Sequence, residues 1–259
     1  MSSIKSLLWV GLIANTALAQ HPGQNISARI DIASVTPHAD TAGVSYVVSV
    51  LPGSVEPLAR FSVDVPGGVL RIGTPGNLWI PLSQFRGRPL AHWIAADSLP
   101  AGSVTPELHF EAVGVPGILT YWVGGVFTFP SLEEPEATDI VDNDPLTSEM
   151  ISGQTVGIEA WPADRTPQAL IARLGILTQR TCTSPLSWIT SSTLCAELTG
   201  YVDQAEASRS AGHVDDARSA LTQFTNAISG SSSGTFAPGV TSPAYWLLRA
   251  NADIIAATL

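Results

Sequence analysis

The spacing of apolar residues changes along this chain, and this change limits the folds that the chain can adopt. Between residues 26 and 129, short runs alternate apolar with polar residues, as in the run from Val44 to Val50. A period of two is typical of strands that bury one face. From residue 165 onward, apolar residues recur every three or four positions, which is the spacing of amphipathic helices. The pattern therefore predicts an α+β chain of two domains, with strands first and helices second.

Turn-forming residues separate the strand-like runs of the first domain. Pairs such as Pro52-Gly53, Pro75-Gly76 and Pro116-Gly117 lie between them, and such pairs interrupt regular structure. Several short strands at this spacing, without helical periodicity between them, predict an antiparallel β-sandwich over residues 20–130, of the immunoglobulin-like or jelly-roll-like type.

The second domain follows an acidic segment. Residues 131–164 are rich in Asp, Glu and Pro, which predicts a linker with a short strand near residues 155–159. Thr166-Pro167 then supply a helix N-cap and a proline at the first helical position. Four amphipathic segments follow, so a four-helix bundle is expected over residues 165–259. The residues on their apolar faces are Leu170, Leu174 and Leu177; Leu194, Leu198, Tyr201 and Ala205; Ala217, Leu221, Phe224 and Ile228; and Tyr245, Leu248, Ala252 and Ile255.

The N-terminus has the features of a secretory signal peptide over residues 1–19. Lys5 precedes a short apolar segment, and Ala17-Leu18-Ala19 fits the cleavage site. The apolar segment is shorter than the ~20 residues that a membrane-spanning helix needs, and no later stretch is long and apolar enough. We therefore expect a protein that is secreted or lies at the cell surface, without a membrane span.

The two cysteines of the chain, Cys182 and Cys195, are expected to form a disulfide outside the cell. Thirteen residues of continuous helix would separate them, a rise of about 20 Å. Because a disulfide needs Cα atoms roughly 4.4–6.8 Å apart, the chain must turn back between them, and Thr183-Ser184-Pro185 is a suitable turn. The bridge would then join the end of the first helix to the second. Two buried free thiols are the alternative.

Several segments of the helical part occur in an informative order. They are Ala163-Asp164-Arg165-Thr166-Pro167, Ala169-Leu170-Ile171-Ala172-Arg173-Leu174, Cys182, Trp188-Ile189, Cys195 and Ala244-Tyr245-Trp246-Leu247-Leu248-Arg249-Ala250-Asn251-Ala252. In this order they resemble a C-terminal helical module, sometimes labelled FIMAH, of many exported bacterial proteins. The resemblance covers residues 163–259 and implies an accessory or interaction unit without an established catalytic role. The preceding part is loosely similar to small exported β-domains through Trp93, Pro100-Ala101-Gly102 and Val115-Pro116-Gly117-Ile118.

Charge and motifs argue against several functions. The formal net charge is −10 and Lys5 is the only lysine, so the chain lacks the cationic surface that nucleic acids and anionic lipids require. The five histidines are scattered without metal-binding spacing, and no Gly-x-Ser-x-Gly elbow precedes a helix. We therefore expect no cofactor, no catalytic metal and no enzymatic activity. The enzymatic alternative is a hydrolase whose carboxylates, such as Asp97, Glu107 or Glu111, converge in one cleft.

Aromatic residues of the first domain are candidates for ligand contact. Tyr121 and Trp122 are adjacent on an expected strand, so one of them should point outward and could contact a ligand such as a sugar. Trp79 and Trp93 are expected in the core instead.

Two further groups of residues are candidates for other sites. Asp139, Asp142 and Asp144 cluster hard oxygen ligands that could hold calcium, although a solvated acidic hinge explains them equally simply. Asn25 begins an Asn-x-Ser sequon, which matters for glycosylation in a eukaryotic host.

These expectations combine into one functional hypothesis with two alternatives. The chain is expected to be an exported, non-catalytic surface or extracellular-matrix protein, whose β-domain binds or self-assembles and whose helical module docks. Its partners would be itself, other extracellular proteins or a polysaccharide. Self-assembly would add an edge strand, or residues 20–25, to a neighbour's sheet. The alternatives are a secreted carboxylate-based hydrolase and a carbohydrate-binding accessory protein.

Overall fold

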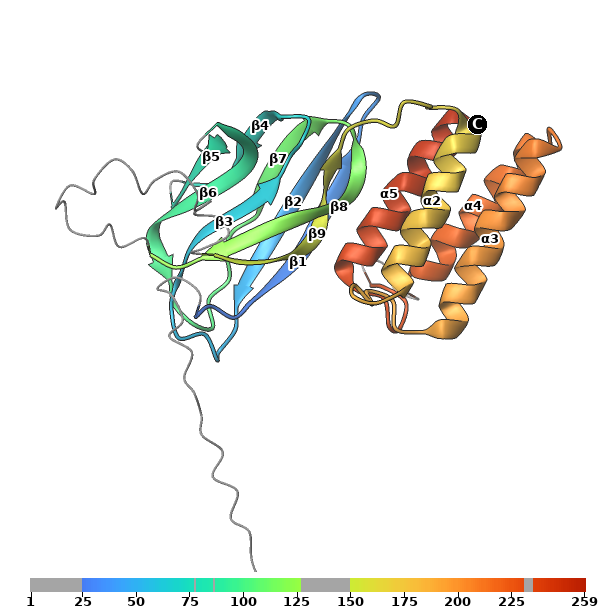
Figure 1. The fold of residues 1–259 in the computed structure, drawn as a ribbon. Coiled ribbons are helices and arrows are strands. Elements are labelled where there is room, and N and C mark those ends of the chain that lie inside the picture. The colour runs from blue at the N-terminus through green and yellow to red at the C-terminus, as the bar shows by residue number, and fades with distance from the viewer. Residues whose placement is uncertain (1–24, 77, 86, 127–149, 231–234) are drawn as a thin grey trace, which may run out of the picture.

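Nine strands and four helices make up the described part of the chain, an α+β arrangement, in this computed structural model. The structure describes residues 25–76, 78–85, 87–126, 150–230 and 235–259. The strands form two antiparallel sheets (Figure 1). One sheet contains, in spatial order, β1 (Ala28–Pro37), β2 (Thr41–Val50), β7 (Leu108–Val113) and β4 (Val69–Gly73). The other contains β5 (Trp79–Phe85), β6 (Arg88–Leu99), β3 (Leu58–Asp64), β8 (Val115–Gly124) and β9 (Ile151–Glu159).

Aromatic side chains fill the space between the two sheets. The ring centroid of Tyr46 in β2 lies 5.3 Å from that of Phe61 in β3 and 6.2 Å from that of Trp93 in β6. The Tyr46 hydroxyl donates a hydrogen bond of 2.6 Å to the Val156 carbonyl oxygen in β9, so this buried phenol has a partner. Trp79 and Trp93 are both buried, which confirms the expectation that they lie in the core.

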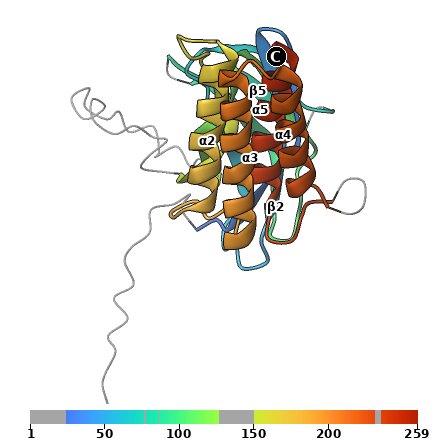
Figure 2. The same ribbon diagram turned by 90° about the vertical axis from the view of Figure 1, so that its right-hand side faces the viewer.

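The helices lie beside the strands on one side of the molecule (Figure 1). They are α2 (Pro167–Cys182), α3 (Ser192–Ser210), α4 (Val214–Ile228) and α5 (Ser242–Thr258). α5 packs against β1, β8 and β9, whereas α3 and α4 lie farther from the strands (Figure 1, Figure 2). Because β1 and β9 are edge strands, one helix covers an edge of each sheet. Most buried apolar residues of strands and helices form one continuous core, and Leu90, Trp122 and Met150 form a separate small cluster.

Local sequence determines where these helices begin. The Thr166 hydroxyl caps α2 by accepting a hydrogen bond of 3.3 Å from the Ala169 N–H, and Pro167 follows at the first helical position. Ser191 and Thr241 cap α3 and α5 in the same way. Each cap satisfies a backbone donor that a helix N-terminus otherwise leaves unpaired. None of these helices is long and apolar enough to cross a membrane.

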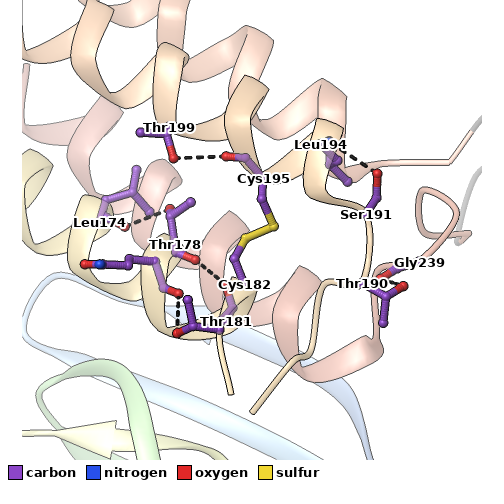
Figure 3. Close-up of a disulfide and its surroundings, with 12 residues drawn as sticks. Leu174, Thr178, Thr181, Cys182, Thr190, Ser191, Leu194, Cys195, Thr199 and Gly239 are labelled. Carbon is purple, nitrogen blue, oxygen red and sulfur yellow. Dashed lines mark hydrogen bonds between the residues drawn. A yellow bond between two sulfur atoms is a disulfide. The ribbon is translucent and has the colours of Figure 1, made fainter. Parts of the chain in front are cut away.

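The disulfide joins the end of α2 to the first turn of α3 (Figure 3). The Cα atoms of Cys182 and Cys195 are 6.0 Å apart, so the chain turns back between them as predicted. The Ile189 N–H donates a hydrogen bond of 3.0 Å to the Thr181 carbonyl oxygen, which holds the connecting segment against the end of α2. The prediction of a disulfide between the first two helices is confirmed.

Strand β9 lies within the range that the sequence pattern assigns to a linker. The strand expected near residues 155–159 begins earlier, at Ile151, and pairs along its whole length with β8. Two glycines hide its alternation: a Cβ at Gly153 would come 2.6 Å from the Tyr121 hydroxyl, and one at Gly157 would come 2.6 Å from a methyl carbon of Leu119. Residues 131–149 lie outside the described residues.

The Pro116-Gly117 pair lies inside β8, so the expectation of a turn at this pair is wrong. β3 pairs only with residues 121–124 of β8, and Pro116 has a strand neighbour on the β9 side alone. Its carbonyl oxygen accepts hydrogen bonds from helix side chains. A proline is tolerated there because the N–H that it lacks would point to the same unpaired side.

Candidate binding cavity

A cavity of about 600 Å³ opens where β3 and β6 separate. Arg60 pairs with Ile94 while Leu58 pairs with Leu99, so two steps along β3 correspond to five steps along β6. Past Ile94, β6 follows β5 instead, and the Ala96 N–H donates a hydrogen bond of 2.8 Å to the Leu78 carbonyl oxygen. Extra residues in one strand form a bulge, which bends that strand and interrupts its pairing. The bulge of β6 thus explains why a hollow opens in this sheet.

The walls of the cavity are mainly apolar. Its largest apolar side chains are Phe85, Ile94 and Val126, and its polar members include Arg60, His92 and Asp97. A volume of this size fits an organic molecule of moderate size. The cavity therefore has the composition of a small-molecule site, with few polar groups among apolar ones.

His92 and Ser62 form a buried pair beside this cavity. Ser62 is fully buried and His92 is 1% exposed, and the Ser62 Oγ lies 2.6 Å from the His92 Nδ1. The imidazole also lies against Phe85, with ring centroids 5.0 Å apart. The other ring nitrogen, Nε2, is buried and has no hydrogen-bond partner among the described residues. A buried polar atom of this kind requires an explanation.

Burial and a neighbouring charge keep this imidazole neutral. Burial, and to a smaller extent the positive charge of Arg60, lower the pKa of His92 to about 4. Arg60 is itself 7% exposed, and its Nε donates a hydrogen bond of 3.1 Å to the Gly125 carbonyl oxygen. Asp97 is exposed. The cavity wall thus combines a buried cation and a neutral imidazole with an exposed carboxylate.

The carboxylates expected for a hydrolase lie apart in the structure. Ser62 is too buried to attack a substrate. Asp97 is the one carboxylate among the described residues that line the cavity. Glu111 lies in the other sheet, where it accepts a hydrogen bond of 2.9 Å from the Thr41 hydroxyl, and Glu107 lines a separate hollow. The structure therefore does not bring the three carboxylates of the enzymatic alternative into one cleft.

Tyr121 and Trp122 do not form an exposed aromatic surface. Tyr121 is partly buried and faces Phe61, with ring centroids 6.4 Å apart. Trp122 lies on the opposite face of the sheet and is 4% exposed, in a small apolar cluster with Leu90 and Met150. The Arg88 guanidinium lies over its ring, with the Cζ atom 4.8 Å from the ring centroid. In this conformation neither ring offers the flat exposed face on which a sugar would stack.

The remaining predicted sites lie elsewhere. Asn25 is partly buried, and its side-chain nitrogen donates a hydrogen bond of 3.4 Å to Glu56. The calcium candidates Asp139, Asp142 and Asp144 fall outside the described residues, as do residues 1–19. Within the described ranges, no group of three or more His, Cys, Asp or Glu side chains is arranged to hold a metal ion.

The sequence pattern did not identify the polar residues of the cavity. Arg60 and Ser62 alternate with buried Phe61 and Val63, and this pattern is typical of a strand with one solvated face. His92 alternates with apolar neighbours in the same way. A strand that is buried on both faces is often apolar throughout. β3 does not give this signal, because Arg60 and Ser62 are polar. Only the packing on the second face shows that these polar residues are buried.

A second polar group, which we call the interface cluster, joins the helices to the strands. It consists of Glu159 from β9, Arg173 from α2, Asn251 from α5 and the carbonyl oxygen of Pro116 in β8. Arg173 donates a hydrogen bond of 2.9 Å to Pro116 and pairs with Glu159 at 3.0 Å. Asn251 donates one of 3.1 Å to the same carbonyl oxygen. Glu159 also accepts a hydrogen bond of 3.0 Å from the Ile118 N–H.

A further hydrogen-bonded contact joins α5 to the edge of β1. The Ser242 hydroxyl accepts a hydrogen bond of 3.1 Å from the Ile32 N–H and donates one of 2.6 Å to the Ile32 carbonyl oxygen. One serine at the start of α5 therefore satisfies both backbone groups of a residue in an edge strand, groups that a further strand would otherwise use.

Comparisons with known proteins add no assignment. No model of a protein family matches the chain, and no curated protein matches it. Arg173 and Asn251, which hold α2 and α5 against β8, belong to segments that carry the resemblance to FIMAH-like modules. That resemblance therefore stays a prediction that rests on the quoted residues alone.

Proposed function

We propose that this protein is an exported, non-catalytic binding protein that takes its ligand in the cavity between β3 and β6. One observation carries the proposal: a mainly apolar hollow of about 600 Å³ is lined by His92, whose buried Nε2 has no partner among the described residues, and by only one carboxylate among its described lining residues. Such a site has the features of recognition and lacks the second carboxylate that a hydrolase of the expected type would use.

Within this proposal the two sheets are a β-sandwich and the helices a four-helix bundle that covers its edges. The contacts of α5 with β1 and β9, together with the interface cluster, support this role. Secretion through residues 1–19 accounts for the oxidised cysteines. Docking to a further extracellular partner would use the faces of α3 and α4 that point away from the strands (Figure 2).

The test combines binding with an activity screen on the full mature chain. Arrays of glycans and peptides identify ligands, and each ligand is then incubated with the protein and analysed for products. In the variant Ala96→Trp, a large side chain enters the exposed part of the cavity wall and should lower affinity by tenfold or more. Ile176→Trp is the matched control, because Ile176 is exposed on α2, on the helical side of the molecule. Formation of product, or binding that Ala96→Trp leaves unchanged, would contradict the proposal.

A second candidate function, self-assembly, is favoured by the exposed edge strand β5. Its apolar residues Ile80 and Leu82 are 52% and 37% exposed, and Leu78, which precedes the strand, is 60% exposed. The backbone of Leu78 is hydrogen-bonded to β6. Because the direction of backbone N–H and C=O groups alternates along a strand, those of Trp79 and Pro81 point away from β6, toward the free edge. A proline there removes a donor from the free edge, so association would depend on side chains more than on added strand pairing. Ile80→Lys should then abolish association in sedimentation experiments, and a strictly monomeric wild-type protein at high concentration would rule out this candidate.

A further inference from the structure

The Nε2 atom of His92 can form a hydrogen bond, but it has no partner among the described residues. Ser62 is fully buried, and its hydroxyl has one hydrogen-bond partner, the His92 Nδ1 at 2.6 Å. Two proton arrangements are compatible with this distance. If Nδ1 carried the imidazole proton and donated it to Ser62, both the Ser62 hydroxyl proton and the Nε2 lone pair would be buried without partners. If Ser62 donates to Nδ1, only one group remains unpaired.

The second arrangement is favoured because it leaves fewer buried polar groups unsatisfied. It places the proton of the neutral imidazole on Nε2. The unpaired group is therefore an N–H donor on a residue that lines the cavity. Its nitrogen is itself buried, so a ligand in the cavity reaches it only when the Phe85 ring that lies against the imidazole moves aside. An N–H donor selects an acceptor, so the complementary ligand atom is a carboxylate, amide or other carbonyl oxygen.

The surroundings of His92 define the rest of the ligand. Phe85 lies against the imidazole, and Ile94 and Val126 extend the apolar wall. The guanidinium of Arg60 also lines the cavity and lowers the pKa of His92, so a second cationic group beside the imidazole is unfavourable, whereas an oxygen acceptor is not. A ligand that excludes water from these apolar walls must carry an apolar group next to its acceptor oxygen.

We propose that the cavity binds a small amphipathic molecule whose carboxylate or carbonyl oxygen accepts a hydrogen bond from the His92 Nε2–H and whose apolar part contacts Phe85, Ile94 and Val126. This inference rests on the proposed function, since it names the ligand class of the same cavity. It assigns His92 as the residue that recognises the polar end of the ligand and Ser62 as the residue that positions the proton on Nε2.

Three probes of one chain length test the chemistry on the full mature chain. Octanoate and octanamide both present an acceptor oxygen, one charged and one neutral, whereas octylammonium presents only donors. We expect octanoate or octanamide to bind at least tenfold more tightly than octylammonium in calorimetric titrations. The ratio between octanoate and octanamide then distinguishes a charged from a neutral ligand end. Equal affinity for octylammonium and the two acceptors would overturn the proposal.

Nitrogen NMR of the imidazoles reports the contact directly and does not depend on a variant that folds. Long-range ¹H–¹⁵N spectra of the ¹⁵N-labelled protein should show His92 protonated at Nε2. Octanamide should shift this nitrogen while leaving the nitrogens of His109, which is exposed on the other sheet, unchanged. A proton on Nδ1, or equal shifts of both histidines, would contradict the inference.

The variant His92→Phe separates recognition from the shape of the cavity. It keeps a planar ring and removes the donor, so affinity for octanamide should fall at least tenfold. Ser62→Ala removes the group that positions the proton, and it should lower this affinity to a smaller extent. If Ala96→Trp abolishes binding of an array ligand while neither acceptor probe binds, the proposed function stands and this inference fails. If no ligand responds to Ala96→Trp, the proposed function itself fails.

Discussion

Two regions of the molecule differ in whether their polar groups have hydrogen-bond partners. One is the pair of sheet edges that α5 covers, and the other is the cavity between β3 and β6. At the helical side, the interface cluster pairs Arg173 with Glu159 and with the Pro116 carbonyl oxygen, and Ser242 satisfies both backbone groups of Ile32. At the cavity, His92 is 1% exposed, and its Nε2 has no partner among the described residues.

The difference follows from the backbone on each side. β8 and β9 pair residue by residue along the whole of β9, so helix side chains can be positioned against a regular surface. β6 bulges between Ile94 and Leu99, so β3 and β6 diverge and no side chain fills the hollow completely. Polar groups that are fully satisfied rigidify a structure, whereas a buried unsatisfied one calls for an explanation. Under the proposed function, the first region contributes stability and the second contributes recognition.

The largest expected effect comes from opening the helical side. Replacing Cys182 and Cys195 together by alanine removes a covalent link across a short loop, and the free energy of unfolding should fall by about 3 kcal/mol. Urea unfolding under oxidising conditions measures the change. Wild type treated with reductant should lose a similar amount, whereas an unchanged midpoint would show that the helical side does not depend on this link.

Acid should weaken the cavity side. The unfolded chain protonates His92 near its ordinary pKa of 6.5, whereas burial lowers the pKa of His92 in the folded protein to about 4. Between these values the unfolded state binds a proton that the folded state does not, so stability is complete above pH 6.5 and falls toward pH 4, by at most about 3 kcal/mol. Urea midpoints of wild type and His92→Phe across this range measure the contribution. Parallel pH profiles for the two proteins would contradict it.

Breaking the interface cluster should destabilise the contact between helices and strands. Arg173→Met leaves the partly buried Glu159 carboxylate and the Pro116 carbonyl oxygen with fewer partners. We expect a loss of about 2 kcal/mol in the free energy of unfolding. Arg218→Met is the matched control, because Arg218 pairs with a highly exposed Asp215, and such surface pairs contribute little. Equal effects of the two variants would show that the cluster carries no special stability.

The smallest expected effect concerns the edge of β1. Ser242→Ala leaves the N–H and C=O groups of Ile32 without their side-chain partner and should cost about 1 kcal/mol. Hydrogen exchange at the Ile32 amide should become faster, while the amide of Val48 in the neighbouring strand β2 changes little. Ser219→Ala, at an exposed position of α4, is the control. Unchanged exchange at Ile32 would mean that α5 protects this edge by packing alone.

Sequence patterns predicted the elements better than their arrangement. The alternation from Val44 to Val50 and the helical spacing of Ala217, Leu221, Phe224 and Ile228 both correspond to faces that are buried in the structure. The sequence pattern predicts too short a strand at β9 because its glycines interrupt the alternation. It predicts a turn at Pro116-Gly117 because the sequence does not reveal that one side of β8 lacks a strand neighbour at this point.

The candidate site was predicted least well. Trp122 was a candidate for ligand contact because alternation places it on the other face from Tyr121 and Val123. That face is covered in the folded protein, where Leu90, Met150 and Arg88 enclose the indole ring. His92 and Ser62, which the structure brings together, are 30 positions apart in the chain. No local pattern connects them, because their contact depends on the pairing of β3 with β6.

Neighbouring residues and covalent geometry encode the classes of local structure, the helix caps and the turn that allows Cys182 to meet Cys195. These features can therefore be predicted from the sequence. Which polar groups become buried, and which of them find partners, depends on surfaces that distant strands and helices bring together, so these features follow from the tertiary fold. For this chain, that distinction separates Arg173, whose hydrogen bonds join helix to strand, from His92, whose Nε2 has no partner among the described residues.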